Sequence, residues 1–135
     1  MTGPSRSGEL QVAVSTSAKA IWSLGFLIGT TTHTLDLINY GWLPYEFRPL
    51  PWNIYWTSLA FLDPLAALAI WLRERWGVML GVAIMASNVM ANGYTLLIGY
   101  DELLIPWLLQ SAFALFVFSV AWRHWTSGKP NAEAQ

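Results

Sequence analysis

Six polar side chains in an otherwise apolar chain have the residue types and spacing to form a binding site. Charged groups at membrane depth cost about 2.5–3.5 kcal/mol each on insertion scales, so they are kept mainly where they line an interior site. A carboxylate among aromatic rings suits a protonated amine, because the rings add cation–π attraction to the opposite charge. The candidate ligand-binding residues are Asp63, Asp36, His33, Asn88, Asn92 and Tyr94.

Helical spacing places these candidates on shared faces. His33 and Asp36 are three positions apart and are therefore neighbours on one helix. Asn88 and Asn92, four positions apart, are neighbours on another helix, and Asp63 lies in a third. Counted at about 1.5 Å per residue from the nearest predicted helix end, all five lie in the same half of the bilayer. We expect them to face one cavity, although hydrogen bonding between helices is an alternative role for the histidine and the two asparagines.

Other chemistries are excluded by residue type. The chain has no cysteine, which excludes disulfides, thiol catalysis and Cys-ligated metals. Its two histidines, His33 and His124, are expected near opposite faces of the membrane, which excludes a bis-histidine heme. There is neither a nucleophile–base spacing nor a phosphate-binding glycine loop, and no basic run suits nucleic acid. We therefore predict no catalytic residue, no cofactor, no metal and no nucleic-acid partner, and favour a protein that is not an enzyme.

Four apolar segments must position the candidate residues. The chain has 135 residues, 55% of them hydrophobic and only 11% charged, whereas soluble domains carry about 25% charged residues. A transmembrane helix needs about 20 mostly apolar residues. The sequence therefore predicts an all-α fold with four membrane spans, at about residues 20–40, 54–72, 76–98 and 103–125. The polar tails, residues 1–19 and 126–135, are expected to be disordered.

Short connections and charge set the expected topology. Neighbouring spans joined by short turns run antiparallel, which predicts a single-domain, up-down-up-down four-helix bundle over residues 20–125. Positive charge near the span ends indicates that both termini are cytoplasmic. The inner side then carries Arg6, Lys19, Arg73, Arg75, Arg123 and Lys129, and the outer side carries only Arg48. We predict an integral membrane protein, most simply of the bacterial inner (cytoplasmic) membrane.

The tryptophans are expected to mark the two membrane interfaces. Aromatic belts at headgroup depth are typical of membrane proteins. Trp42, Trp52 and Trp56 would mark the outer interface. The first outer loop, residues 41–53, also holds three prolines and cannot be a continuous helix. We interpret it as a rigid cap that either covers the mouth of the cavity or only anchors the bundle.

Small residues at helical spacing indicate close helix contacts. The first and third spans each contain a G-x-x-x-G pattern, formed by Gly25 and Gly29 and by Gly77 and Gly81. Such patterns let two helix backbones approach closely. They indicate either a homodimer through these four glycines or packing within a single bundle.

Residues 30–65 resemble the EXPERA superfamily of emopamil-binding-protein-like and sigma-2-receptor-like membrane proteins. The shared features are Asp36 in the first span, the loop residues Glu46, Phe47 and Arg48, and Asp63 followed by Pro64. The resemblance implies a four-span bundle with cytoplasmic termini and an acidic intramembrane pocket for sterols or amphiphilic amines. The third span carries Asn88 and Asn92 where the family's sterol isomerases are acidic, so the resemblance implies binding without isomerisation.

These observations favour one function and leave two alternatives open. The favoured function is binding of a lipid-like or cationic amphiphilic molecule in an outward-facing polar cavity within the membrane. One alternative is a small homodimeric proton-coupled transporter, with Asp63 as its coupling carboxylate. The other is an accessory subunit of a larger membrane complex. The expected partners are the lipid bilayer, an amphiphilic ligand and a second copy of the chain.

Overall fold

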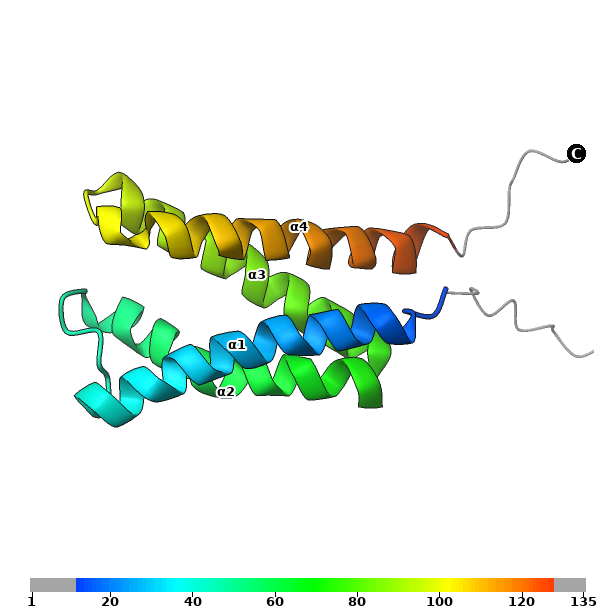
Figure 1. Ribbon diagram of the computed structural model, residues 1–135, viewed down its shortest axis with the longest axis horizontal. Coiled ribbons are helices and arrows are strands. Elements are labelled where there is room, and N and C mark those ends of the chain that lie inside the picture. Colours follow the sequence, from blue (N-terminus) through cyan, green and yellow to red (C-terminus); the bar gives the residue numbers. More distant parts are fainter. Residues whose placement is uncertain (1–11, 128–135) are drawn as a thin grey trace, which may run out of the picture.

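The computed structural model describes residues 12–127, which form an all-helical bundle without strands (Figure 1). The long helices are α1 (Thr16–Tyr40), α2 (Leu50–Leu72), α3 (Glu74–Leu97) and α4 (Leu104–Thr126). A 3-10 turn, η1 (Asp101–Leu103), precedes α4. The prediction of an all-α fold is confirmed. Most of the two predicted tails lies outside the described residues.

Two helices begin earlier than expected, and each start has a local cause. α1 begins at Thr16, where residue 20 was expected, because the Ser15 side chain accepts a hydrogen bond from the Ala18 amide at 3.2 Å. α2 begins at Leu50, where residue 54 was expected, and takes Pro51 into its first turn. Proline is tolerated there because the first amides of a helix have no partner within the helix.

Three segments of the described chain are long and apolar enough to cross a membrane. They are Leu50–Leu72, Glu74–Leu97 and Asp101–Thr126. α1 has 25 residues but is not among them. Threonines, His33 and Asp36 in its second half lower its mean hydropathy. Length and composition therefore support three of the four predicted spans.

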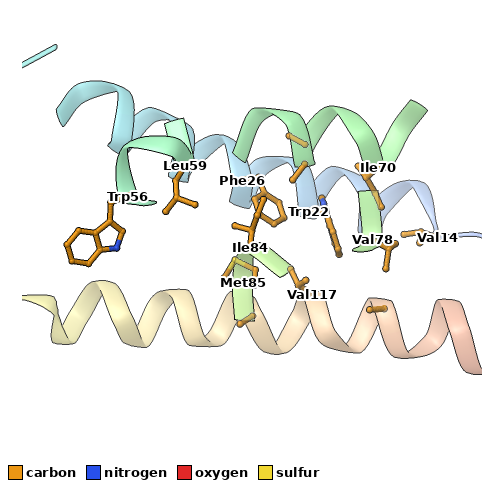
Figure 2. Packing of buried hydrophobic residues seen from close by; sticks show 14 residues of the cluster. Val14, Trp22, Phe26, Trp56, Leu59, Ile70, Val78, Ile84, Met85 and Val117 are labelled. Carbon is orange, nitrogen blue, oxygen red and sulfur yellow. The ribbon is translucent and has the colours of Figure 1, made fainter. Parts of the chain in front are cut away.

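Large apolar side chains from all four helices form the core. Trp22 and Phe26 of α1 are fully or almost fully buried, and Figure 2 shows them pointing toward Ile84, Met85 and Val117 of the facing helices. Consecutive helices pack against each other along the chain, whereas α1 and α4 touch much less. Figure 1 shows α1 and α4 separating toward one end of the bundle. We call this the loop end, because residues 41–49 and 98–103 lie there.

The opposite end, which we call the terminal end, is closed by a polar cluster. Glu74, which begins α3, pairs with Lys19 of α1 at 2.6 Å and accepts a hydrogen bond from the Val14 amide at 2.7 Å. His124 of α4 lies 3.4 Å from the same carboxylate. These contacts join the segment before α1 to α3 and α4. These contacts therefore hold the helices together at the terminal end, whereas α1 and α4 are further apart at the loop end.

The four glycines of the two G-x-x-x-G patterns all pack within the chain, too closely to leave room for a Cβ. The facing residues are Phe113 for Gly25, Asp63 for Gly29, Ile70 for Gly77 and Trp22 for Gly81. Gly77 is the most constrained, because a Cβ there would meet the α2 backbone, which cannot move aside as a side chain can. The structure accounts for all four glycines by packing within one bundle, and a homodimer through them stays a prediction.

Candidate functional site

A mostly apolar cavity of about 670 Å³ lies between α1 and α4 in the half of the bundle near the loop end. Its volume falls within the range of about 300–1,000 Å³ that is usual for small-molecule sites. Phe26, Met85 and Phe113 line its apolar part. Ile105 and Leu109 of α4 also line it, yet they are 63% and 69% exposed. The cavity therefore reaches the molecular surface through the gap between α1 and α4.

The polar end of the cavity is a cluster of three side chains centred on Tyr45. The Tyr45 hydroxyl donates a hydrogen bond to Asp36 Oδ2 at 2.8 Å and lies 2.7 Å from His33 Nδ1. All three residues line the cavity. Because the single hydroxyl proton goes to Asp36, the contact with His33 is satisfied when Nδ1 carries a hydrogen and donates it to the tyrosine oxygen. The cluster then contains a histidine that donates from Nδ1, a tyrosine that donates to Asp36, and one acidic side chain.

The tyrosine in this cluster remains a hydrogen-bond donor over the physiological range. Burial, together with the hydrogen bond to the Asp36 carboxylate, raises the pKa of the Tyr45 hydroxyl above its ordinary value. Loss of its proton would also place a second negative charge beside Asp36.

Asn53 in the first turn of α2 holds the loop that carries Tyr45. It is only 4% exposed. Its Oδ1 accepts the Tyr45 amide at 3.0 Å, and its Nδ2 donates to the Leu43 carbonyl at 2.8 Å. Leu43 has a φ of 59°, a left-handed conformation that costs a leucine energy and persists only where its surroundings impose it. Asn53 therefore stabilises the backbone turn that directs Tyr45 toward α1.

Hydrogen-bonded side chains in the cavity wall connect α2 to α4 through α3. The Trp56 indole donates to Asn92 Oδ1 at 3.0 Å, and Asn92 Nδ2 donates to Gln110 Oε1 at 2.9 Å. Asn88 lies behind Asn92, with its Oδ1 3.3 Å from the same Nδ2. Trp56, Asn92 and Gln110 line the cavity, whereas Asn88 is buried and does not. The network fixes the position of α4 relative to α2 and α3 and gives the middle of the cavity polar groups.

Three of the six predicted site residues do not line the cavity: Asn88, Asp63 and Tyr94. Asp63 is 3% exposed and packs against Gly29, with its Oδ1 lacking a hydrogen-bond partner among the described residues. Gly29, which Asp63 contacts, itself lines the cavity. Tyr94 is 50% exposed and stacks on Trp52, with ring centroids 5.7 Å apart. The structure thus brings His33, Asp36 and Asn92 together around the cavity and places Asn88 in support of Asn92.

The sequence interpretation did not assign four residues that shape the site. They are Tyr45, Asn53, Trp56 and Gln110. The tyrosine has a sequence signal, since it lies in the loop that was predicted to cap the cavity, and both Tyr45 and Phe47 line it. Trp56, which is expected at the outer interface, is only 4% exposed and lines the cavity.

The fold and the cavity together define a class: a helical bundle with three helices apolar enough for a membrane, and an apolar cavity with one carboxylate at its polar end. Within residues 12–127, no group of three histidine or acidic side chains is arranged to hold a metal ion. Comparisons of the chain with protein-family models, curated proteins and solved structures found no match. The EXPERA resemblance therefore remains a prediction.

Proposed function

We propose that the protein binds an amphiphile with a cationic headgroup inside the membrane. The ammonium group lies beside Asp36, and the apolar body lies against Phe26, Met85 and Phe113. The observation that carries this proposal is a carboxylate at the polar end of an apolar cavity, without a cation from the described chain to neutralise it.

Charge accounting supports a cationic headgroup. Both ion pairs formed within residues 12–127 involve Glu74 at the terminal end, so neither neutralises Asp36. The Tyr45 hydroxyl satisfies only part of the hydrogen-bonding capacity of that carboxylate, which can accept about four hydrogen bonds. A carboxylate in an apolar environment is costly unless it is paired. A ligand ammonium supplies both the charge and the missing donors.

The aromatic lining and the surface gap support an amphiphile that arrives from the bilayer. Tyr45, Phe47 and Trp56 lie at the polar end of the cavity, where their faces add cation–π attraction to a bound amine. The opening between α1 and α4 is bordered by exposed apolar residues, among them Ile28 and Leu109. A lipid-like molecule can pass through this gap without exposing its apolar body to water.

We further propose that α1 is the fourth span, which completes an up-down-up-down bundle. It is hydrogen-bonded to the apolar helix α2: Ser23 Oγ donates to the Ala67 carbonyl and accepts from the Trp71 indole. Thr30, Thr31 and Thr32 each donate to the carbonyl four residues earlier in α1, so their hydroxyl hydrogens are satisfied without water. α1 therefore crosses the membrane together with α2.

The basic residues support an orientation with both termini cytoplasmic. Lys19, Arg73, Arg75 and Arg123 lie in the parts of the described chain that meet at the terminal end, and Arg48 lies at the loop end. The cavity then faces the outer half of the bilayer. A bacterial inner membrane fits this arrangement, as proposed from the sequence.

The two alternative functions receive less support. The four glycines of the proposed dimer faces pack against side chains or backbone of their own chain, which leaves a homodimeric transporter without a free small-residue surface. An accessory subunit needs a partner to complete its polar interior. The Asn92 network is satisfied within one chain, so it does not call for such a partner, although Asp63 Oδ1 and Arg48 Nε have no partner among the described residues.

A matched set of ligands tests the proposed function. Dodecylamine, dodecanol and dodecanoate share one tail and differ in headgroup charge, and each is titrated against the purified full-length protein in mild non-ionic detergent. We expect the amine to bind at least about tenfold more tightly than the alcohol, a difference of about 1.4 kcal/mol, and the carboxylate to bind most weakly. Protein-free micelles correct for partitioning. Equal affinities for amine and alcohol would refute a charge-selective cavity.

A further inference from the structure

A buried arginine at the loop end has a feature that the amphiphile cavity does not explain. Arg48 is 9% exposed, and its guanidinium carbon lies over the rings of Trp52, Tyr94 and Tyr100, at 5.3, 5.9 and 5.5 Å from their centroids. These rings come from α2, α3 and the segment that follows α3. Arg48 does not line the cavity. It forms a separate, preformed cationic group enclosed by aromatic faces.

The aromatic rings attract the faces of this guanidinium, and its N–H donors, which lie in the plane of the group, point away from the rings' faces toward other acceptors. A guanidinium carries five N–H donors in its plane, whereas cation–π attraction acts on its face. Arg48 Nε is buried and has no hydrogen-bond partner among the described residues. Neither of the ion pairs within residues 12–127 includes Arg48. The two terminal nitrogens of Arg48 are not among the buried atoms without a partner. They are therefore the donors that an acceptor from outside the described chain can reach.

We propose that Arg48 binds the phosphate of a phospholipid headgroup. The planar fork of an arginine matches two oxygens of a phosphate, which makes it the preferred side chain for such recognition. Trp42 belongs to the same loop as Arg48 and is exposed, as expected for an aromatic residue at headgroup depth. The proposal concerns a site outside the cavity, and it holds whether or not the cavity binds an amine.

Acidic residues at the loop end are expected to select among phospholipids. Glu46, Asp101 and Glu102 are exposed at the same end of the bundle. These acids repel a headgroup with a net negative charge and attract one that also carries an amine. The site therefore favours phosphatidylethanolamine, whose phosphate meets Arg48 while its ammonium faces the acidic residues.

Native mass spectrometry of the purified full-length protein tests this site. The protein in mild detergent is titrated separately with phosphatidylethanolamine, with phosphatidylglycerol and with inorganic phosphate. We expect one tightly bound phosphatidylethanolamine, weaker phosphatidylglycerol and the weakest binding by inorganic phosphate. Inorganic phosphate binding as tightly as the lipid would overturn the lipid assignment, and tighter phosphatidylglycerol would overturn the role of the acids.

Variants of Arg48 link the bound lipid to this residue. Arg48→Gln is expected to lower the lipid affinity about tenfold or more, as loss of charged hydrogen bonds implies. Arg75→Gln, which removes an exposed arginine at the terminal end, serves as the charge-matched control and is expected to bind as the unmodified protein does. Arg48→Lys keeps the charge and the aromatic contacts, and is expected to lose part of the affinity because it lacks the paired donors. Unchanged binding in Arg48→Gln, or in Arg48→Lys if the glutamine variant fails to fold, would overturn the proposal.

Discussion

Replacing Asp36 with asparagine is expected to lower the affinity for dodecylamine about ten- to a hundredfold. A hydrogen bond to a charged group contributes about 1.5–3 kcal/mol, and each 1.4 kcal/mol corresponds to about a factor of ten in affinity. The fold is expected to survive, because an asparagine side chain can still accept the hydrogen bond from Tyr45. Dodecanol affinity, which does not depend on the carboxylate charge, is expected to stay unchanged in the variant.

Asp63→Asn is the matched control for this prediction. It makes the same chemical change at a buried aspartate that contacts Gly29 of α1 and does not line the cavity. We expect the amine affinity of this variant to remain within about twofold of the unmodified protein, since it alters no cavity contact. The reverse result, with binding lost in Asp63→Asn and kept in Asp36→Asn, would move the charge partner to Asp63 and contradict the site proposed here.

Replacing Asn53 with alanine is expected to lower both stability and amine affinity. The substitution leaves the Tyr45 amide and the Leu43 carbonyl without their partner, and an orphaned buried group costs about 1–3 kcal/mol. Leu43 then has less reason to keep its left-handed conformation, and the tyrosine that donates to Asp36 loses its support. Thermal unfolding in detergent, followed by the dodecylamine titration, measures the two effects.

Asn39→Ala provides the comparison for Asn53. Asn39 is exposed near the end of α1, so its replacement is expected to change the free energy of unfolding by no more than about 0.5 kcal/mol. An Asn53→Ala protein that unfolds at the same temperature as Asn39→Ala and binds the amine equally well would show that the loop does not need this hydrogen-bonding residue.

The helices were largely predictable because hydropathy is a property of local sequence. Long apolar runs marked α2, α3 and α4, and the structure contains helices at these positions. The early start of α2 was not predicted, because Pro51 suggests a loop until its place in the first helical turn is known. α1 carries enough polar residues that its own hydropathy does not identify it as a span. Its place in the membrane is part of the proposal and rests on its hydrogen bonds to α2.

The proximity of two site residues was predictable where both lie on one helix. It was less predictable where it depends on how two helices are rotated against each other. His33 and Asp36 are neighbours by spacing alone, and the structure joins them through Tyr45. The position of Asp63 along its helix was also predictable. The direction of its side chain depends on how α2 is rotated against α1, which it meets at Gly29. Tyr94 shows the same limit, since it faces the surface and stacks on Trp52. Helix rotation is set by packing between segments distant in sequence, which local patterns do not encode.

Photolabelling tests most directly whether an amphiphile binds between α1 and α4. The probe is dodecylamine with a photoreactive diazirine at the end of its tail, added to the full-length protein in detergent, with labelled positions found by peptide mass spectrometry. The account predicts labels on cavity-lining residues such as Phe26, Met85 and Phe113, which excess unlabelled dodecylamine removes. Labels confined to outward-facing residues such as Leu68 and Leu115, both exposed, and insensitive to competitor would contradict it.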